Sequence, residues 1–402
     1  MNAPTDIEDP ARSSGRSGFA LFQYGFRPFF LFGSLYPAVS LVVWVTIWRG
    51  SAAWQPAMPA NIWHGHEMLF GFAAAALAGF MLTAVPNWTG AAALKGLRLV
   101  GLFGLWLAGR VAAFLPEPTL FMVLDLMFLP VLALVLGPAV IARNGRRNGI
   151  LIAVLLLLAL LNAAVHFDGF GLDAFNASAA LEVAVAVFAM LICIIGGRIV
   201  PAFTLGGMRL AGTPVEIVPN RAVDLAAILS LALFLLASLF SAPTSLVGGL
   251  ALAAAVANLV RFWRWQGWRC WRVPLVWSLH LGYAWLVVGL AILGATKLLD
   301  LAIGTVGLHA LTAGAFGTMI LAVMARASLG HTGRPLLADR AITGAFLLVT
   351  VGASLRVAAP LGGSFERALI ESAALFWAAA FLTFFFRYLP VLLWSRPDGR
   401  PG

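Results

Sequence analysis

The stretch NIWHGHEMLFGF, residues 61–72, opens an apolar segment that continues to Pro86. His64, His66 and Glu67 stand at its start, and the rest of the segment carries no charge. Ionisable groups at the edge of hydrocarbon are costly to desolvate, so in membrane helices they mark function by default. Histidine is neutral at physiological pH and is a good ligand for iron, copper and zinc. The stretch therefore predicts a membrane helix with a cofactor or metal site at its mouth.

The composition extends this prediction to the whole chain. Of 402 residues, 61% are hydrophobic and only 10% are charged, whereas about a quarter of residues are charged in soluble domains. A transmembrane helix needs about 20 apolar residues, and the chain offers twelve such segments. They are residues 29–48, 64–86, 97–115, 118–142, 149–166, 177–197, 222–241, 243–262, 273–296, 304–325, 340–359 and 368–394. The predicted fold class is an all-α polytopic membrane protein with twelve transmembrane helices.

The net charge of +10 invites a nucleic-acid partner, but the positions of the charges argue against one. With a cytoplasmic N-terminus, nearly all of the 26 Lys and Arg residues fall on the cytoplasmic side. The exceptions are Arg49, Arg110, Lys297, Arg356 and Arg367. This is the positive-inside pattern, and it predicts both termini inside the cell. We expect a disordered cytoplasmic tail over 1–18, one transmembrane domain over 19–396, and a second tail over 397–402.

Residues 1–18 lack the positively charged N-terminal region and the apolar core that mark a cleavable signal peptide. We therefore expect a multi-pass protein of a bacterial inner membrane, in contact with lipid. The predicted spans over 64–86, 177–197 and 304–325 recur every four helices, and each ends in a polar, glycine-rich exit. Three four-helix units would account for that recurrence.

Two histidines are the favoured axial ligands of a haem. His66 and His309 each lie a short way below the predicted outer surface, on antiparallel helices. The small residues of 310–317 leave room for a flat macrocycle, because small side chains permit close approach. Arg110 and Arg356 are candidates to hold a haem propionate, although snorkelling to the interface also explains Arg110.

His64 and His66 are two positions apart, which is about 200° of rotation on a regular helix. Either each serves a different centre, or the helix begins between them. His64 shares a face with Glu67 and Met68, and imidazole with thioether suits copper. His280 lies deeper, too far from His309 to share a metal. His166 and His331 read as an interfacial and a loop residue, and structural histidines remain an alternative throughout.

At these residues the chain resembles the NnrS family of bacterial inner-membrane proteins linked to nitric oxide metabolism. The matching stretches are FRPFF (26–30), WHGHEMLFGF (63–72), TAVPNWTG (83–90), GGRIVPAFT (196–204), HLGYAWL (280–286) and HALTAGAFGTMILAVMARASLGHTGR (309–334). The resemblance implies a twelve-span protein that contains haem and copper and protects against nitrosative stress. It leaves open whether the protein turns over nitric oxide or an iron–nitrosyl species, and which electron donor serves it.

The four-helix recurrence is also similar, remotely, to the catalytic subunit of haem–copper oxidases, where the second and tenth helices carry haem ligands. Here helix ten offers one histidine rather than two, helix six offers none, and no His-His pair stands on helix seven. Two other classes of function stay open. A transporter would line a path with Arg110, Asp125, Glu182 and His280, and a membrane sensor or assembly factor would have no catalysis.

Overall fold

The computed structural model describes residues 18–52, 54–142, 149–301, 303 and 305–400. The predicted tail over 1–18 lies outside this range except for Gly18. The same is true of the cytoplasmic cations Arg12, Arg16, Arg143, Arg146 and Arg147, so their predicted place stays a prediction.

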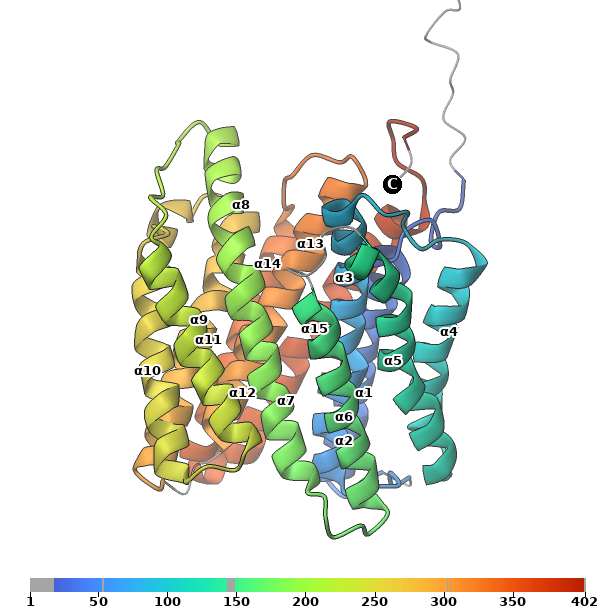
Figure 1. The fold of residues 1–402 in the computed structure, drawn as a ribbon, viewed down its shortest axis with the longest axis vertical. Coiled ribbons are helices and arrows are strands. Elements are labelled where there is room, and N and C mark those ends of the chain that lie inside the picture. Colours follow the sequence, from blue (N-terminus) through green and yellow to red (C-terminus); the bar gives the residue numbers. More distant parts are fainter. Residues whose placement is uncertain (1–17, 53, 143–148, 302, 304, 401–402) are drawn as a thin grey trace, which may run out of the picture.

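The described chain forms twelve helical rods, one for each predicted span (Figure 1). The first six are α1 (Phe26–Trp48); α2, η2 and α3 (Ala60–His66, Glu67–Ala73, Ala74–Thr89); α4 (Leu97–Ala112); α5 (Pro118–Ala142); α6 (Gly149–Gly169); and α7, η4 and α8 (Ala177–Leu191, Ile192–Gly196, Gly197–Leu210). The others are α9 (Arg221–Leu239); α10 (Thr244–Trp263); α11 (Pro274–Leu298); α12, η6 and α13 (Thr305–His309, Ala310–Phe316, Gly317–His331); α14 (Arg340–Ala358); and α15 (Glu366–Leu393).

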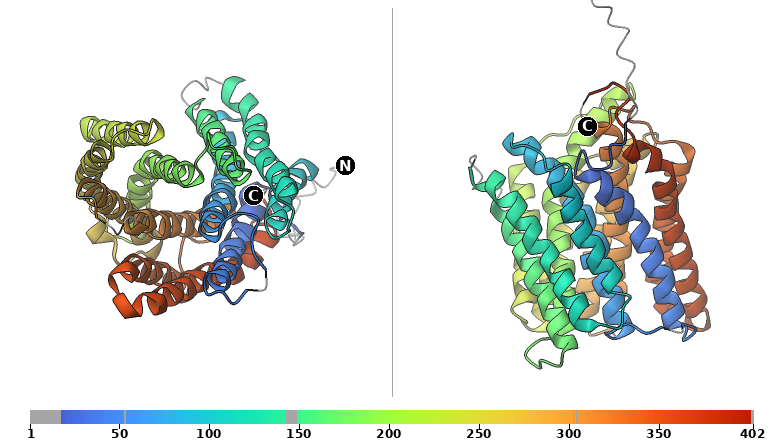
Figure 2. Two further views of the ribbon diagram at one scale, coloured as in Figure 1. Left: turned by 90° about the horizontal axis from the view of Figure 1, so that it is seen from below. Right: turned by 90° about the vertical axis from the view of Figure 1, so that its right-hand side faces the viewer.

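Eleven of these rods are long and apolar enough to cross a membrane, and α4 is the shorter twelfth, with 16 residues. The rods run side by side along one direction (Figure 2, right). Within the described residues the only β contact is an isolated bridge between Phe19 and Trp394. The prediction of an all-α polytopic membrane protein is confirmed.

The first and last rods close the bundle. Helix α1 packs against α3 and α15. The Arg27 guanidinium donates to backbone carbonyls at the end of α15, at 2.9 Å to Leu392 and 3.0 Å to Trp394. Those carbonyls have no partner inside their own helix. Arg27 therefore caps α15, a more specific role than an interfacial anchor.

Local chemistry sets the ends of other helices. Asparagine and aspartate side chains accept the backbone N–H three residues on at the starts of α7, α9 and α14, from Asn176, Asn220 and Asp339. At the other end of the second rod, the sequence predicts a stop at Pro86, but α3 continues to Thr89. It ends at Gly90, whose φ of 66° is the left-handed conformation that glycine adopts without strain.

The second, sixth and tenth rods share a feature that the sequence pattern does not show. Each contains a π-helical segment: η2, η4 and η6. They are also the three most buried of the eleven candidate spans. A π turn leaves carbonyls without their usual helical donor, and in each segment a side chain from a neighbouring rod donates to one of them. The pairs are Trp106 Nε1 to Gly71 O (3.0 Å), Arg261 Nη1 to Cys193 O (2.8 Å) and Trp377 Nε1 to Ala313 O (3.1 Å). This recurrence agrees with three four-helix units.

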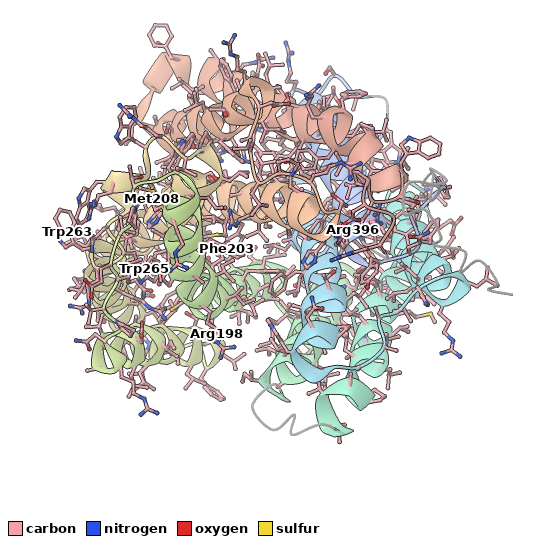
Figure 3. The ribbon with its side chains drawn as sticks, turned by 90° about the horizontal axis from the view of Figure 1, so that it is seen from above. Arg198, Phe203, Met208, Trp263, Trp265 and Arg396 are labelled. Atoms are coloured by element: carbon pink, nitrogen blue, oxygen red, sulfur yellow. The ribbon has the colours of Figure 1, made fainter. Side chains whose placement is uncertain are left out.

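The tryptophan-rich segment after α10 lies at the end of the molecule that carries the C-terminus. Figure 3 looks onto that end and labels Trp263 and Trp265 beside Arg198 of α8, with Arg396 on the far side. Trp263, Trp268 and Trp271 are 65%, 55% and 67% exposed. Exposed tryptophans among arginines are typical of a membrane interface.

Candidate functional site

A cavity of about 400 Å³ lies between α1, the second rod, α7, the tenth rod, α14 and α15. It sits toward the end of the bundle away from the C-terminus, where α2 and α12 are found (Figure 1). Its wall is mainly apolar, and Thr312 and Ala313 of the small-residue segment form part of it. The ionisable and sulfur-bearing side chains that line it are His64, Met68, Glu182, His309 and Arg356. A mostly apolar cavity with a few converging polar groups is the usual form of a ligand site.

His309 stands at the junction of α12 and η6 and has one defined hydrogen bond. Its Nδ1 lies 2.8 Å from the carbonyl oxygen of Thr305. Because a carbonyl only accepts, Nδ1 carries the proton and Nε2 carries a lone pair. An imidazole whose second nitrogen is tied to a backbone carbonyl is the form in which histidine ligates metals. His309 is therefore prepared to act as a ligand.

His64 enters the same cavity from α2. Its ring stacks on Trp44 of α1, with centroids 4.4 Å apart and planes 28° apart. Neither of its ring nitrogens makes a hydrogen bond to any residue that the structure describes. The stacked ring is held in place while its nitrogens stay free, so α2 and α12 bring two available imidazoles to one cavity.

Arg356 of α14 brings a positive charge to the cavity wall. Its Nη1 is buried and has no hydrogen-bond partner among the described residues. Burying a guanidinium nitrogen without a partner is costly, which favours an anionic group in the cavity. Glu182, the acidic side chain on this wall, is paired with Lys297 at 3.0 Å.

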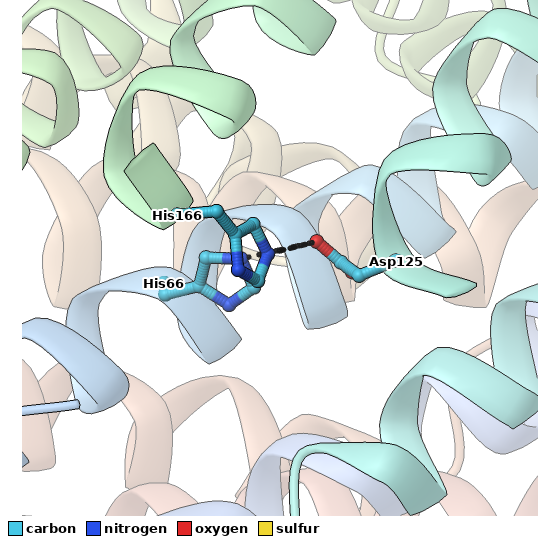
Figure 4. Close-up of side chains that lie close together, drawn as sticks. All are labelled: His66, Asp125 and His166. Carbon is cyan, nitrogen blue, oxygen red and sulfur yellow. Dashed lines mark hydrogen bonds and ion pairs between the residues drawn. The ribbon is translucent and has the colours of Figure 1, made fainter. Parts of the chain in front are cut away.

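The opposite side of α2 carries a closed polar network. His66 is fully buried, and its Nδ1 lies 2.8 Å from Glu67 Oε1. Its Nε2 lies 3.1 Å from Asp125 Oδ2 of α5 and 2.8 Å from Asn162 Oδ1 of α6. His166, one turn beyond Asn162, places its Nε2 3.1 Å from the same Asp125 oxygen (Figure 4).

Arg110 of α4 completes this network. It donates to Glu67 Oε2 at 2.5 Å and forms an ion pair with Asp125 Oδ1. The hydroxyl of Tyr36 donates to the same oxygen of Glu67. All of these side chains are almost fully buried, and together they join five helical rods. We call Tyr36, His66, Glu67, Arg110, Asp125, Asn162 and His166 the acidic cluster.

The structure changes the predicted ligand pairs. His66 does not line the cavity of His309, because the two-residue step from His64 turns it to the other side of α2. The histidine that shares the cavity with His309 is His64. Arg110 likewise belongs to the acidic cluster and not beside Arg356. The helix does not begin between His64 and His66, since α2 starts at Ala60, and the two histidines face different sides of it.

The remaining predicted residues are spread over the bundle. Met68 lines the cavity with His64, as expected for a face shared by the two, but Glu67 turns into the acidic cluster. His280 lies outside the cavity, with Nε2 2.8 Å from Thr204 Oγ1 and a buried Nδ1 that has no partner within the described ranges. The ring of His331 packs 5.5 Å from that of Phe26.

Sequence reasoning missed the joint role of Asp125, Asn162 and His166. The sequence suggests Asp125 only as a residue of a transporter path and His166 only as an interfacial residue, and it gives no signal for Asn162. One signal was available: Arg110, Asp125 and His166 sit at similar depths near the outer ends of three successive predicted spans. Polar groups at one depth on adjacent helices are placed to meet.

Comparison with known proteins places the chain in a family. The sequence model of the family described as "NnrS protein" matches residues 20–396, nearly the whole chain. No curated protein matches it.

Proposed function

The chain belongs to the NnrS family, and from that premise we propose that it is a haem-binding protein of the bacterial inner membrane that meets nitric oxide inside the bilayer. The observation that carries this proposal is the cavity that His64 and His309 share. Nitric oxide is small, apolar and soluble in membranes, so a cofactor inside the bundle is a reasonable place to meet it.

The cavity residues fit a haem in three respects. His309 offers Nε2 because its Nδ1 is bonded to Thr305 O, and His64 offers a second imidazole from the neighbouring rod. The partnerless Nη1 of Arg356 would pair with a propionate. The small side chains of Thr312 and Ala313 in η6 line the cavity and leave space for the macrocycle. When bound, the haem would supply an iron atom to which nitric oxide binds in exchange for one of the two imidazoles.

Copper, the second metal that the resemblance implies, has a ligand pair in the same cavity. Met68, four residues on from His64, lines the same wall, with its Sδ 3.9 Å from Ser40 Oγ, and imidazole with thioether suits copper. His64 cannot serve both metals in one geometry, so a copper ion held by His64 and Met68 is the competing occupant. The two occupants give different absorption spectra.

The test is the absorption spectrum of the protein purified in detergent. We expect a Soret band that is lost in His309→Gly and restored when imidazole is added to that variant, because free imidazole replaces the missing ligand. His331→Gly is the matched control, since His331 lies outside the cavity, and it should keep the band. A full Soret band in His309→Gly without imidazole would contradict the proposal, as would a correctly folded wild-type protein that takes up no haem.

The transporter alternative has less support. Its four path residues fall in three separate places: Arg110 and Asp125 in the acidic cluster, Glu182 on the cavity wall, and His280 beside Thr204. A translocation path needs its polar groups along one route.

A further inference from the structure

We propose that His66, Asp125 and His166 of the acidic cluster bind a divalent transition-metal ion, at a site separate from the cavity. The three residues come from α2, α5 and α6. Their ligand atoms all lie within 4.8 Å of one another, and all three residues are buried. Figure 4 shows the two imidazole rings and the carboxylate converging on one point.

The hydrogen bonds around His66 leave its Nε2 facing two oxygens with no proton between them. Its Nδ1 lies against the carboxylate of Glu67, which only accepts, so Nδ1 carries the proton. In the neutral ring, Nε2 then carries a lone pair. That lone pair faces two oxygens, Asp125 Oδ2 at 3.1 Å and Asn162 Oδ1 at 2.8 Å.

The amide of Asn162 cannot resolve this conflict by turning over. Its Nδ2 donates to Asp125 Oδ2 at 2.6 Å, which fixes Oδ1 as the atom that faces His66. Lone pairs on a nitrogen and two oxygens therefore meet at one point, where they repel one another. A cation at that point converts the repulsion into coordination.

The charge count also leaves room for a cation. Glu67 and Asp125 are two buried carboxylates, and among the residues that the structure describes Arg110 is the one guanidinium that pairs with both. With neutral histidines the cluster holds an excess negative charge away from water, which is unfavourable. Arg110 and Tyr36 engage Glu67 Oε2, and Arg110 also engages Asp125 Oδ1. Asp125 Oδ2 is left turned toward the two imidazoles.

The donor set indicates the class of metal. Two imidazole nitrogens and a carboxylate oxygen, with the Asn162 oxygen as a possible fourth ligand, suit Zn²⁺ or Cu²⁺. Ca²⁺ and Mg²⁺ prefer all-oxygen sites. In a tetrahedral zinc site, ligand atoms about 2.0–2.1 Å from the ion are roughly 3.3 Å apart, close to the 3.1 Å that separates each Nε2 from Asp125 Oδ2. Glu67 behind His66 completes a carboxylate–histidine–metal arrangement.

A proton is the competing occupant. An imidazolium at His66 would supply one donor and one positive charge without any metal. His166 would then be an ordinary hydrogen-bond donor to Asp125. A metal-binding experiment distinguishes the proton from the metal, because only a bound metal needs the His166 imidazole as a ligand.

The experiment uses the full-length protein in detergent, stripped with a chelator and titrated with Co²⁺, whose visible absorption reports a site of nitrogen and oxygen ligands. We expect one equivalent to bind to the wild type. In His166→Gln, which keeps a hydrogen-bond donor, the affinity should fall by about tenfold or more. His331→Gln is the matched control and should bind as the wild type does.

Two results would overturn the proposal: a folded wild-type protein that binds no Co²⁺, or a His166→Gln variant with unchanged Co²⁺ affinity. Thermal unfolding in detergent checks that each variant is folded, and Asp125→Asn provides a second ligand change should His166→Gln not accumulate. The His309→Gly variant should keep its Co²⁺ site, because His309 is not in the acidic cluster. Failure of the haem proposal is thus distinguishable from failure of this one.

Discussion

The two sides of helix α2 carry histidines two residues apart and use them differently. On one side, His64 faces a cavity and its nitrogens are free of hydrogen bonds within the described structure. On the other side, both nitrogens of His66 are in contact with oxygens of the acidic cluster. The two sides also differ in their arginines. Arg110 bridges two carboxylates, and Arg356 has a buried nitrogen without a partner.

This contrast distinguishes a site that has room for a large cofactor from a site whose side chains already bond to one another. Residue type does not separate them, because each side holds histidine and arginine. What separates them is the number of hydrogen-bonding atoms that neighbours already engage. The open side can accept a new molecule at little cost. The closed side can accept only an ion that fits between groups already in place.

The largest expected effect comes from exchanging the two arginines for methionine. Arg110→Met leaves two buried carboxylates without their cation and should lower the free energy of unfolding by about 3–5 kcal/mol. Arg356→Met removes a charge whose buried nitrogen has no partner among the described residues, so it should leave the free energy of unfolding unchanged or raise it. Thermal unfolding of the two variants in detergent measures both values. Equal destabilisation would break the comparison between the sides.

A substitution that fills the cavity tests whether haem binds on the His64 side of α2. Ala374 lines the cavity, and Ala374→Phe places a phenyl ring in the space proposed for haem. We expect haem affinity to fall by about 1–3 kcal/mol, roughly ten- to a hundredfold in Kd, while the melting temperature stays the same or rises. Haem titration of the apoprotein gives the Kd. An unchanged affinity would mean that the haem binds elsewhere.

Substituting the tryptophans that donate to carbonyls of the π segments should lower the free energy of unfolding by an intermediate amount. Trp106→Phe leaves the buried carbonyl of Gly71 without its donor, and Trp377→Phe does the same to the partly buried carbonyl of Ala313. An unsatisfied buried acceptor costs about 1–3 kcal/mol. Trp88→Phe is the control, because Trp88 is 46% exposed. Melting temperatures that fall no further in the first two variants than in the control would show that these hydrogen bonds do not hold the π segments.

The smallest change in the free energy of unfolding is expected at the exposed ion pair of Asp339 and Arg387. It serves as a reference for the buried ion pairs of Arg110. Burial would raise the pKa of Asp339, but the N–H of Ile342 and the guanidinium of Arg387 lower it below the ordinary 3.8. A lowered pKa means that the stabilisation is complete above 3.8 and is lost as the pH falls through the lowered value. Asp339→Asn should therefore cost less than about 1 kcal/mol at pH 7. The difference from wild type should vanish in acid, and a difference that persists there would show that the charge is not its cause.

Most of the fold could be predicted because it depends on composition and on segment length. Twelve apolar segments and the alternation of arginines are properties of single stretches of chain. The π segments could not be predicted, because they depend on donors from other helices: Trp106, Arg261 and Trp377. The extension of α3 past Pro86 has a local reason, because Pro86 removes only its own N–H from the helix and its carbonyl still accepts from the Gly90 N–H at 2.8 Å.

The site could be predicted only in part. Sequence placed His64, Met68, His309 and Arg356 at the outer end, and the structure brings all four to one cavity. It favoured His66 as the partner of His309, whereas His64 is the histidine that shares the cavity with His309. Depth along a helix can be read from a sequence, but rotation toward a distant helix cannot. The acidic cluster could not be predicted because residues that touch within it are far apart in the sequence, 96 positions in the case of His66 and Asn162.

The most direct test of the account compares the cofactors of His64→Ala and His66→Gln in protein purified from the same haem-replete cells. Haem is measured by the Soret band, and the second site by Co²⁺ titration after chelation. The account predicts opposite losses: His64→Ala loses haem and keeps the Co²⁺ site, and His66→Gln keeps haem and loses the Co²⁺ site. If folded samples of both variants lose the same cofactor, the two sides of α2 are not separate centres and the account is wrong.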